Sequence, residues 1–156
     1  MGQSVRPSSV GLPRLIMIGA FRISMVWDMV TTFLGTLLIL NGVHFISIGL
    51  SIVGTLTVGA FNFSTRAILE TKRGGQREIY LIRAAWLLAI VFDFVTSLVC
   101  NATYVALGRF QLGGPDLIPL SLSFSQSVII LFITLLTTIS PMLVGYLRVR
   151  APGFLA

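Results

Sequence analysis

Four long apolar segments constrain the fold of this chain more than any other feature of its sequence. They run from about Leu15 to Leu40, Phe45 to Leu69, Ala84 to Leu107 and Leu120 to Leu147. A helix of roughly 20 mainly apolar residues crosses the hydrocarbon core of a bilayer, which is about 30 Å thick. The sequence therefore predicts an all-α integral membrane protein, a four-helix bundle with one span in each segment.

The composition agrees with a protein that lies in lipid. Apolar residues make up 55% of the 156 residues and charged residues only 10%, whereas a soluble domain carries about 25% charged residues. Too few charges remain for the surface of a soluble enzyme, and the net charge of +6 does not indicate nucleic-acid binding. No aromatic residues alternate with the basic ones to stack bases, so we expect no nucleic-acid partner.

The basic residues predict the orientation of the spans, because short loops rich in Lys and Arg stay in the cytoplasm. Arg109 is the one basic residue on the opposite side. We therefore expect a cytoplasmic segment 1–14, a basic cytoplasmic loop 70–83 and a cytoplasmic tail 148–156 around a transmembrane region 15–147. The expected location is a bacterial inner membrane or an organellar membrane, as a multi-pass protein. The ten residues on the cytoplasmic side are Arg6, Arg14, Arg22, Arg66, Lys72, Arg73, Arg77, Arg83, Arg148 and Arg150.

A short motif occurs twice. The residues 26–32 read Val-Trp-Asp-Met-Val-Thr-Thr, and the residues 91–97 read Val-Phe-Asp-Phe-Val-Thr-Ser, at an offset of 65 residues. The first and third spans point in the same direction, so the motif predicts two helical hairpins related as parallel repeats. The second and fourth spans show no clear similarity to each other.

Each copy of the motif puts an acidic residue on a polar helical face, because positions three and four residues apart share one face. The second and fourth spans carry comparable small or polar faces, which include Asn62 and Thr138. Polar residues of the two motif-bearing spans form a candidate intramembrane polar site: Asp28, Thr31, Thr32, Asp93, Thr96, Ser97 and Asn101.

Three interpretations of the acidic pair remain open. An Asp at the centre of a span costs roughly 2.5–3.5 kcal/mol on insertion scales, so an acid inside a membrane suggests a function. Asp28 and Asp93 could bind a proton or a monovalent cation, or they could accept hydrogen bonds that hold neighbouring helices together. They could also pair with Arg22 or with a basic group of a partner subunit.

Small residues and one proline predict how the helices pack. Membrane helices approach closely where residues are small, so we expect packing positions at Gly35, Gly54, Gly59 and Gly145. Pro141 lies inside the fourth span and should kink it.

The sequence contains no motif of a known catalytic or metal-binding chemistry. It lacks a glycine-rich phosphate loop, a Cys-x-x-Cys pair and a His-Glu-x-x-His motif, and it has one histidine and one cysteine. We therefore expect no catalytic residues, no cofactor and no metal. The predicted function is that of a non-enzymatic packing or accessory subunit of a membrane assembly or a homo-oligomer, in contact with the lipid bilayer. The alternative is a small proton- or cation-coupled transporter or channel that uses the two Asp residues.

Overall fold

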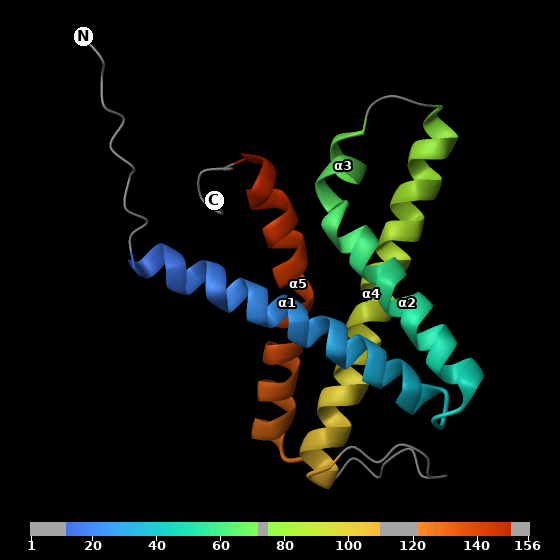
Figure 1. The fold of residues 1–156 in the computed structure, drawn as a ribbon, viewed down its shortest axis with the longest axis vertical. Coiled ribbons are helices and arrows are strands. Elements are labelled where there is room, and N and C mark those ends of the chain that lie inside the picture. Colours follow the sequence, from blue (N-terminus) through green and yellow to red (C-terminus); the bar gives the residue numbers. More distant parts are fainter. Residues whose placement is uncertain (1–11, 72–74, 110–121, 151–156) are drawn as a thin grey trace.

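The computed structural model describes residues 12–71, 75–109 and 122–150, and these residues form helices and no strand. The predicted all-α fold is confirmed for this part of the chain. Figure 1 shows the helices in sequence order. Their bounds are α1 (Leu12–Ile39), α2 (Phe45–Phe63), α3 (Thr65–Glu70), α4 (Gln76–Leu107) and α5 (Phe124–Arg150).

Among the described residues, four helices are long and apolar enough to cross a membrane. This confirms the predicted number of spans and supports a multi-pass membrane protein. The candidate spans are Leu15–Ile39, Phe45–Phe63, Gln76–Leu107 and Phe124–Val144.

The ends of two helices follow from local backbone chemistry. Asn41 and Gly42 follow α1 with φ angles of 54° and 151°, and Asn and Gly are the residues that adopt such angles most readily. Gly108 ends α4 with a φ of 64°, and its amide donates to the carbonyl of Tyr104 at 2.8 Å. A glycine in this left-handed conformation is a common way to end a helix.

The bounds of three helices differ from the predicted spans. The predicted span 45–69 is divided at Ser64, where α2 ends and α3 begins. The fourth helix, α4, begins at Gln76 rather than at Ala84, so part of the predicted basic loop is helical. This stretch is more polar than the rest of α4, and it continues the helix beyond the predicted apolar segment. The helix α5 is described from Phe124, and the predicted start at residue 120 lies outside the described residues, as do 1–11, 72–74 and 151–156 of the predicted cytoplasmic segments.

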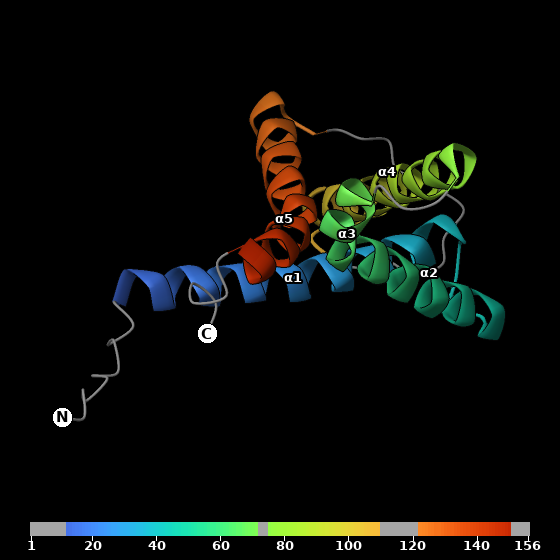
Figure 2. The same cartoon turned by 90° about the horizontal axis from the view of Figure 1, so that it is seen from above.

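The four long helices cross one another and do not run side by side along their whole length. In Figure 1, α1 lies across α4 and α5, and every pair among α1, α2, α4 and α5 is in contact. Figure 2 shows that the blue first half of α1 extends away from the other helices. The residues of α1 that are buried against the other helices lie in its second half, between Asp28 and Leu37.

The distribution of polar and apolar side chains is the reverse of that in a soluble protein. Among the described residues, buried polar side chains outnumber buried apolar ones. Large apolar side chains point outward, including Phe45 at 93% and Ile23 at 73% exposure. Such a surface is unfavourable in water, whereas in a bilayer these side chains meet lipid tails.

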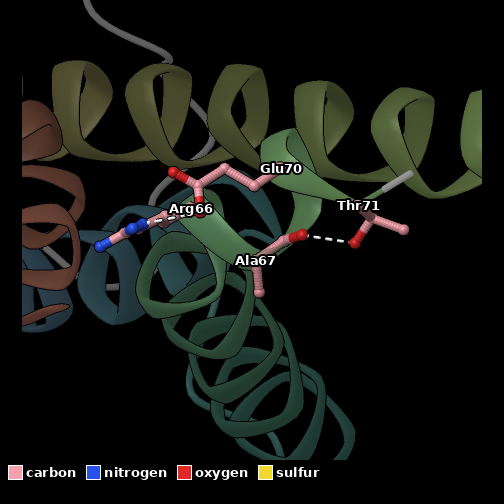
Figure 3. Close-up of polar contacts among 4 residues, drawn as sticks. All are labelled: Arg66, Ala67, Glu70 and Thr71. Carbon is pink, nitrogen blue, oxygen red and sulfur yellow. Dashed lines mark hydrogen bonds and ion pairs between the residues drawn. The ribbon is translucent and has the colours of Figure 1, made fainter. Parts of the chain in front are cut away.

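The short helix α3 lies between α2 and α4 and is shown from close by in Figure 3. Arg66 Nε pairs with Glu70 Oε2 at 2.9 Å, one helical turn apart. The hydroxyl group of Thr71 donates to the carbonyl of Ala67 and so satisfies a carbonyl in the last turn.

Two side chains of α4 fix α3 in place. Trp86 Nε1 donates to Thr65 Oγ1 at 3.0 Å, and Arg83 Nη2 donates to the carbonyl of Leu69 at 3.0 Å. A basic side chain at the end of a helix satisfies a free carbonyl and interacts favourably with the helix dipole. The start of α4 therefore supports α3, which is also in contact with α5.

The helix α5 continues through Pro141. Figure 2 shows that its orange first part and its red last part run in different directions. Proline has no amide hydrogen and so removes one hydrogen bond of the helix. The sequence predicted a kink at Pro141, and the missing hydrogen bond is a physical reason for a bend in this helix.

Candidate intramembrane polar site

Polar side chains from all four long helices meet inside the bundle. Asp28 of α1 is 2% exposed and Asp93 of α4 is fully buried. Asn62 of α2 donates to Asp93, and Thr138 of α5 lies beside Asp28. We call the connected set the acidic cluster, and it consists of Asp28, Thr31, Thr32, Asn62, Asp93, Ser97 and Thr138.

Both carboxyl oxygens of Asp93 accept hydrogen bonds. The hydroxyl group of Thr32 donates to Oδ1, and Asn62 Nδ2 donates to Oδ2 at 2.8 Å. The two donors come from α1 and α2, so Asp93 connects three helices. A carboxylate is a strong acceptor, which makes this contact the polar centre of the bundle.

Asp28 has a different environment. Its carboxyl group lies near the carboxyl group of Asp93 and beside the hydroxyl group of Thr138. Within the described part of the chain, Asp28 Oδ1 has no donor and Thr138 Oγ1 has no partner. Ionised carboxylates only accept hydrogen bonds, so the two carboxyl groups can bond to each other only when one of them carries a proton.

Three hydroxyl groups form a bridge between α1 and α4. Thr31 Oγ1 and Ser97 Oγ are 2.8 Å apart, and Thr32 Oγ1 and Ser97 Oγ are 3.3 Å apart. Thr31 also donates to the carbonyl of Asp28 at 3.0 Å. In the second copy of the motif, Thr96 does the same to the carbonyl of Asp93 at 3.0 Å.

Two of the predicted site residues lie outside the acidic cluster. Thr96 is fully buried, but its hydroxyl group donates to backbone carbonyls of its own helix. Asn101 Nδ2 donates to Thr134 Oγ1 at 2.9 Å and forms a separate contact between α4 and α5. The other five predicted residues belong to the cluster.

The prediction of the site missed Asn62 and Thr138. Both lie on small or polar faces of their helices, which is the only signal of them in the sequence. The spacing within one helix does not reveal which other helix that face will meet. The contact of Asn62 with Asp93 depends on how α2 crosses the second copy of the motif, and the position of Thr138 beside Asp28 depends on how α5 crosses the first copy.

The ion pair of Asp28 with Arg22, one of the three interpretations of the acidic pair, does not occur among the described residues. Arg22 is exposed, Asp28 is buried, and the salt bridge in this part of the chain joins Arg66 and Glu70. Arg22 and Asp28 are six residues apart on α1 and therefore point to different sides of the helix.

The predicted packing glycines differ in their surroundings. A Cβ atom at Gly35 would lie 1.9 Å from the carbonyl oxygen of Thr96, and one at Gly54 would make ordinary contact with the ring of Phe92 at 3.6 Å. A Cβ atom at Gly59 would meet nothing within 4 Å, so the described residues give Gly59 no packing role. The surroundings of Gly145 lie outside the described residues.

No group of three His, Cys, Asp or Glu side chains that could hold a metal ion occurs among the described residues. Comparison with protein-family models, with curated proteins and with solved structures finds no match. The chemistry of the acidic cluster is therefore the main basis for a functional proposal.

Proposed function

We propose that this protein binds and releases a proton or a monovalent cation at the acidic cluster, as a small transporter or channel of the membrane. The observation that carries the proposal is that Asp28 and Asp93 are both buried and lie near each other inside the bundle. A cluster that only held helices together would have all its polar atoms satisfied. Here Asp28 Oδ1, Asn62 Oδ1 and Thr138 Oγ1 have no partner among the described residues.

The energies involved also favour a binding role over a purely structural one. Hydrogen bonds between membrane helices contribute on average about 0.6 kcal/mol and at most about 1.7 kcal/mol. An Asp at the centre of a span costs roughly 2.5–3.5 kcal/mol. Hydroxyl and amide side chains would connect the helices at a smaller cost, so a second function accounts better for two acids.

Flux measurements on proteoliposomes test the proposal. We expect the wild-type protein to move protons or sodium ions when a pH or sodium gradient is imposed. Asp28→Asn and Asp93→Asn keep the shape of the side chain but remove its charge, and we expect both to abolish the flux. Asn101→Leu alters a polar contact outside the cluster and serves as the control that retains flux. Absence of flux from the wild type under both gradients would overturn the proposal.

A second candidate is an accessory subunit of a membrane assembly or a homo-oligomer. It is supported by the first half of α1, which extends beyond the other helices (Figure 2). Leu15, Ile16 and Ile23 are exposed on this part at 61%, 62% and 73%. A second copy or another membrane protein could pack against it. Cross-linking in native membranes through a cysteine introduced at Ile16 would detect such a neighbour, and an uncross-linked monomer would argue against it.

The orientation proposed for either role has both termini and the segment between α3 and α4 in the cytoplasm. The basic residues around these segments support it. The end of α3, the start of α4 and the last turns of α5 lie toward one end of the molecule in Figure 1. We also propose that the hairpins α1–α2 and α4–α5 are parallel repeats, on the basis of the shared motif, and that the protein is not an enzyme.

A further inference from the structure

The two acids occupy matching positions in the repeated motif but receive unequal hydrogen bonding. Asp93 accepts from Thr32 and Asn62, whereas Asp28 Oδ1 has no donor among the described residues. The residue that matches Thr32 in the second copy is Ser97. It contacts Thr31 and Thr32 and does not donate to Asp28. The motif alone would make the acids equivalent, and the contacts make them different.

The unequal number of donors determines which acid is better suited to be ionised and which to be protonated. Donors that point at both oxygens stabilise an ionised carboxylate, and Asp93 has such donors. A protonated carboxyl group has an O–H that must find an acceptor. Each oxygen of Asp93 has a second lone pair, so Asp93 can accept the O–H of Asp28 while it keeps its bonds from Thr32 and Asn62.

We infer that the ligand of the acidic cluster is a proton, which Asp28 binds and releases, and that Asp93 is a fixed anion that holds it. This inference rests on the binding role proposed above and names the ligand and the carrier. On uptake, a hydronium ion gives its proton to a carboxylate oxygen of Asp28 and becomes water. The new O–H group donates to Asp93. On release, the same O–H bond breaks and the proton returns to water.

A metal cation fits this arrangement less well than a proton. A bound alkali ion is surrounded by bare oxygen atoms, and the oxygens of Asp93 already face a hydroxyl hydrogen from Thr32 and an amide hydrogen from Asn62. The lone pair that remains on each oxygen could contact an ion, but several further oxygen atoms would have to move in to replace its hydration shell. A proton on Asp28 requires no such change.

Of the groups near Asp28, only Asp93 can carry a charge among the described residues. Among the described residues, α4 contributes Asp93, α5 contributes the uncharged Thr138, and α2 reaches the cluster through the uncharged Asn62. Cys100, the other titratable side chain on the inner face of α4, is seven residues from Asp93, about two helical turns away. Thr138 can donate its free hydroxyl to Asp28 once the proton has left, which gives the ionised form a partner.

Infrared spectroscopy of the full chain in lipid vesicles tests the assignment. A protonated carboxyl group has a C=O stretching band that shifts when its O–H becomes O–D in heavy water. We expect this band in the wild type and in Asp93→Asn, and its loss in Asp28→Asn. Asn101→Leu is the matched control and should retain it. Loss of the band in Asp93→Asn together with retention in Asp28→Asn would overturn the inference, as would its absence from the wild type.

A second pair of variants covers the case that Asp93→Asn does not fold. Thr32→Val and Asn62→Leu each remove one donor from Asp93 and leave both acids in place. The hydrogen bonding of the two acids then becomes more alike. We therefore expect a second carboxyl band, because the proton is bound to Asp28 in some molecules and to Asp93 in others. An unchanged single band in both variants would overturn the inference. If the bands behave as expected but the vesicles show no flux, the assignment of the proton stands and the transport role falls.

Discussion

At Gly35 the backbone of α1 comes very close to the backbone of α4. A Cβ atom there would lie 1.9 Å from the carbonyl oxygen of Thr96 and 2.5 Å from its carbonyl carbon. Because the obstructing atoms belong to the backbone, no side-chain rotation can relieve the contact. This close approach also brings Thr31 and Thr32 within hydrogen-bond distance of Ser97, so the glycine positions the acidic cluster.

We predict that Gly35→Ala destabilises the bundle. Overpacking of a tight interior typically costs about 1–3 kcal/mol, and the contact with backbone atoms places this variant at the upper end. Thermal unfolding in detergent micelles should show a lower melting temperature than that of the wild type. The control is Gly49→Ala on α2, where a Cβ atom meets nothing within 4 Å. Equal melting temperatures for both variants would show that α1 and α4 do not cross at Gly35.

Residues of the cluster could be predicted from the sequence where their positions follow from one helix alone. The spacing of Asp28, Thr31 and Thr32 puts them on one face whatever the helix packs against. The contact of Asn62 with Asp93 depends on the angle between two helices, which no local pattern specifies. The absence of a packing partner at Gly59 also depends on how the helices cross, so the sequence could not predict it.

At the scale of the elements, α4 and α5 are connected by a contact separate from the cluster. Asn101 Nδ2 donates to Thr134 Oγ1 at 2.9 Å, and Thr134 is fully buried. In a bilayer neither group has water as an alternative partner, but the unfolded helices can still find other partners in the membrane. The net contribution of such a bond is therefore modest.

A double-mutant cycle measures this contribution. We predict that Asn101→Leu and Thr134→Val each lower the free energy of unfolding, and that the double variant loses less than the sum of the two. The coupling energy should be about 0.6 kcal/mol and below about 1.7 kcal/mol. Unfolding in mixed micelles of increasing denaturing detergent gives the four free energies. Additive losses would mean that the two side chains do not interact.

The helix α3 should depend on the side chains of α4 for its order. It has only six residues, and so short a helix is not stable by itself. We predict that Trp86→Phe and Arg83→Gln, which remove the donors to Thr65 and Leu69, increase amide hydrogen exchange in Thr65–Glu70 by several-fold. Arg77→Gln changes an exposed basic residue of the same helix and should leave the exchange unchanged. Unaltered protection of α3 in both test variants would contradict this account.

The ends of α1 and α4 were predictable within a residue, because apolar length and turn residues such as Asn41 are local features. The break at Ser64 was not, since no Gly or Pro marks it and serine and threonine are common in helices of membrane proteins. The extension of α4 to Gln76 was also missed, because hydropathy identifies the part of a helix that lies in lipid and not the turns that continue beyond it.

At the scale of the whole molecule, lipid and not water is the solvent that makes this fold stable. Exposed apolar side chains cover the outside, and the interior holds buried hydroxyl, amide and carboxyl groups. Composition predicted this reversal. The crossing of α1 over α4 and α5 (Figure 1) was not predictable, because it results from the close approach at Gly35 and from the polar contacts around it.

The basic residues predict the orientation of the whole molecule in the membrane. A reporter that is active only in the cytoplasm should be active when it is fused after Ala156 or inserted at Gly75, and inactive when it is inserted at Gly42. The reason is the excess of basic residues, ten of eleven, on the side that holds both termini, since such segments are retained in the cytoplasm. A reporter active only outside the cytoplasm should give the opposite pattern, which controls for loss of expression. Replacing Arg66, Arg77 and Arg83 by Gln should weaken the bias and produce a mixture of orientations. If the Gly42 fusion alone is active in the cytoplasm, the orientation is the reverse of the predicted one.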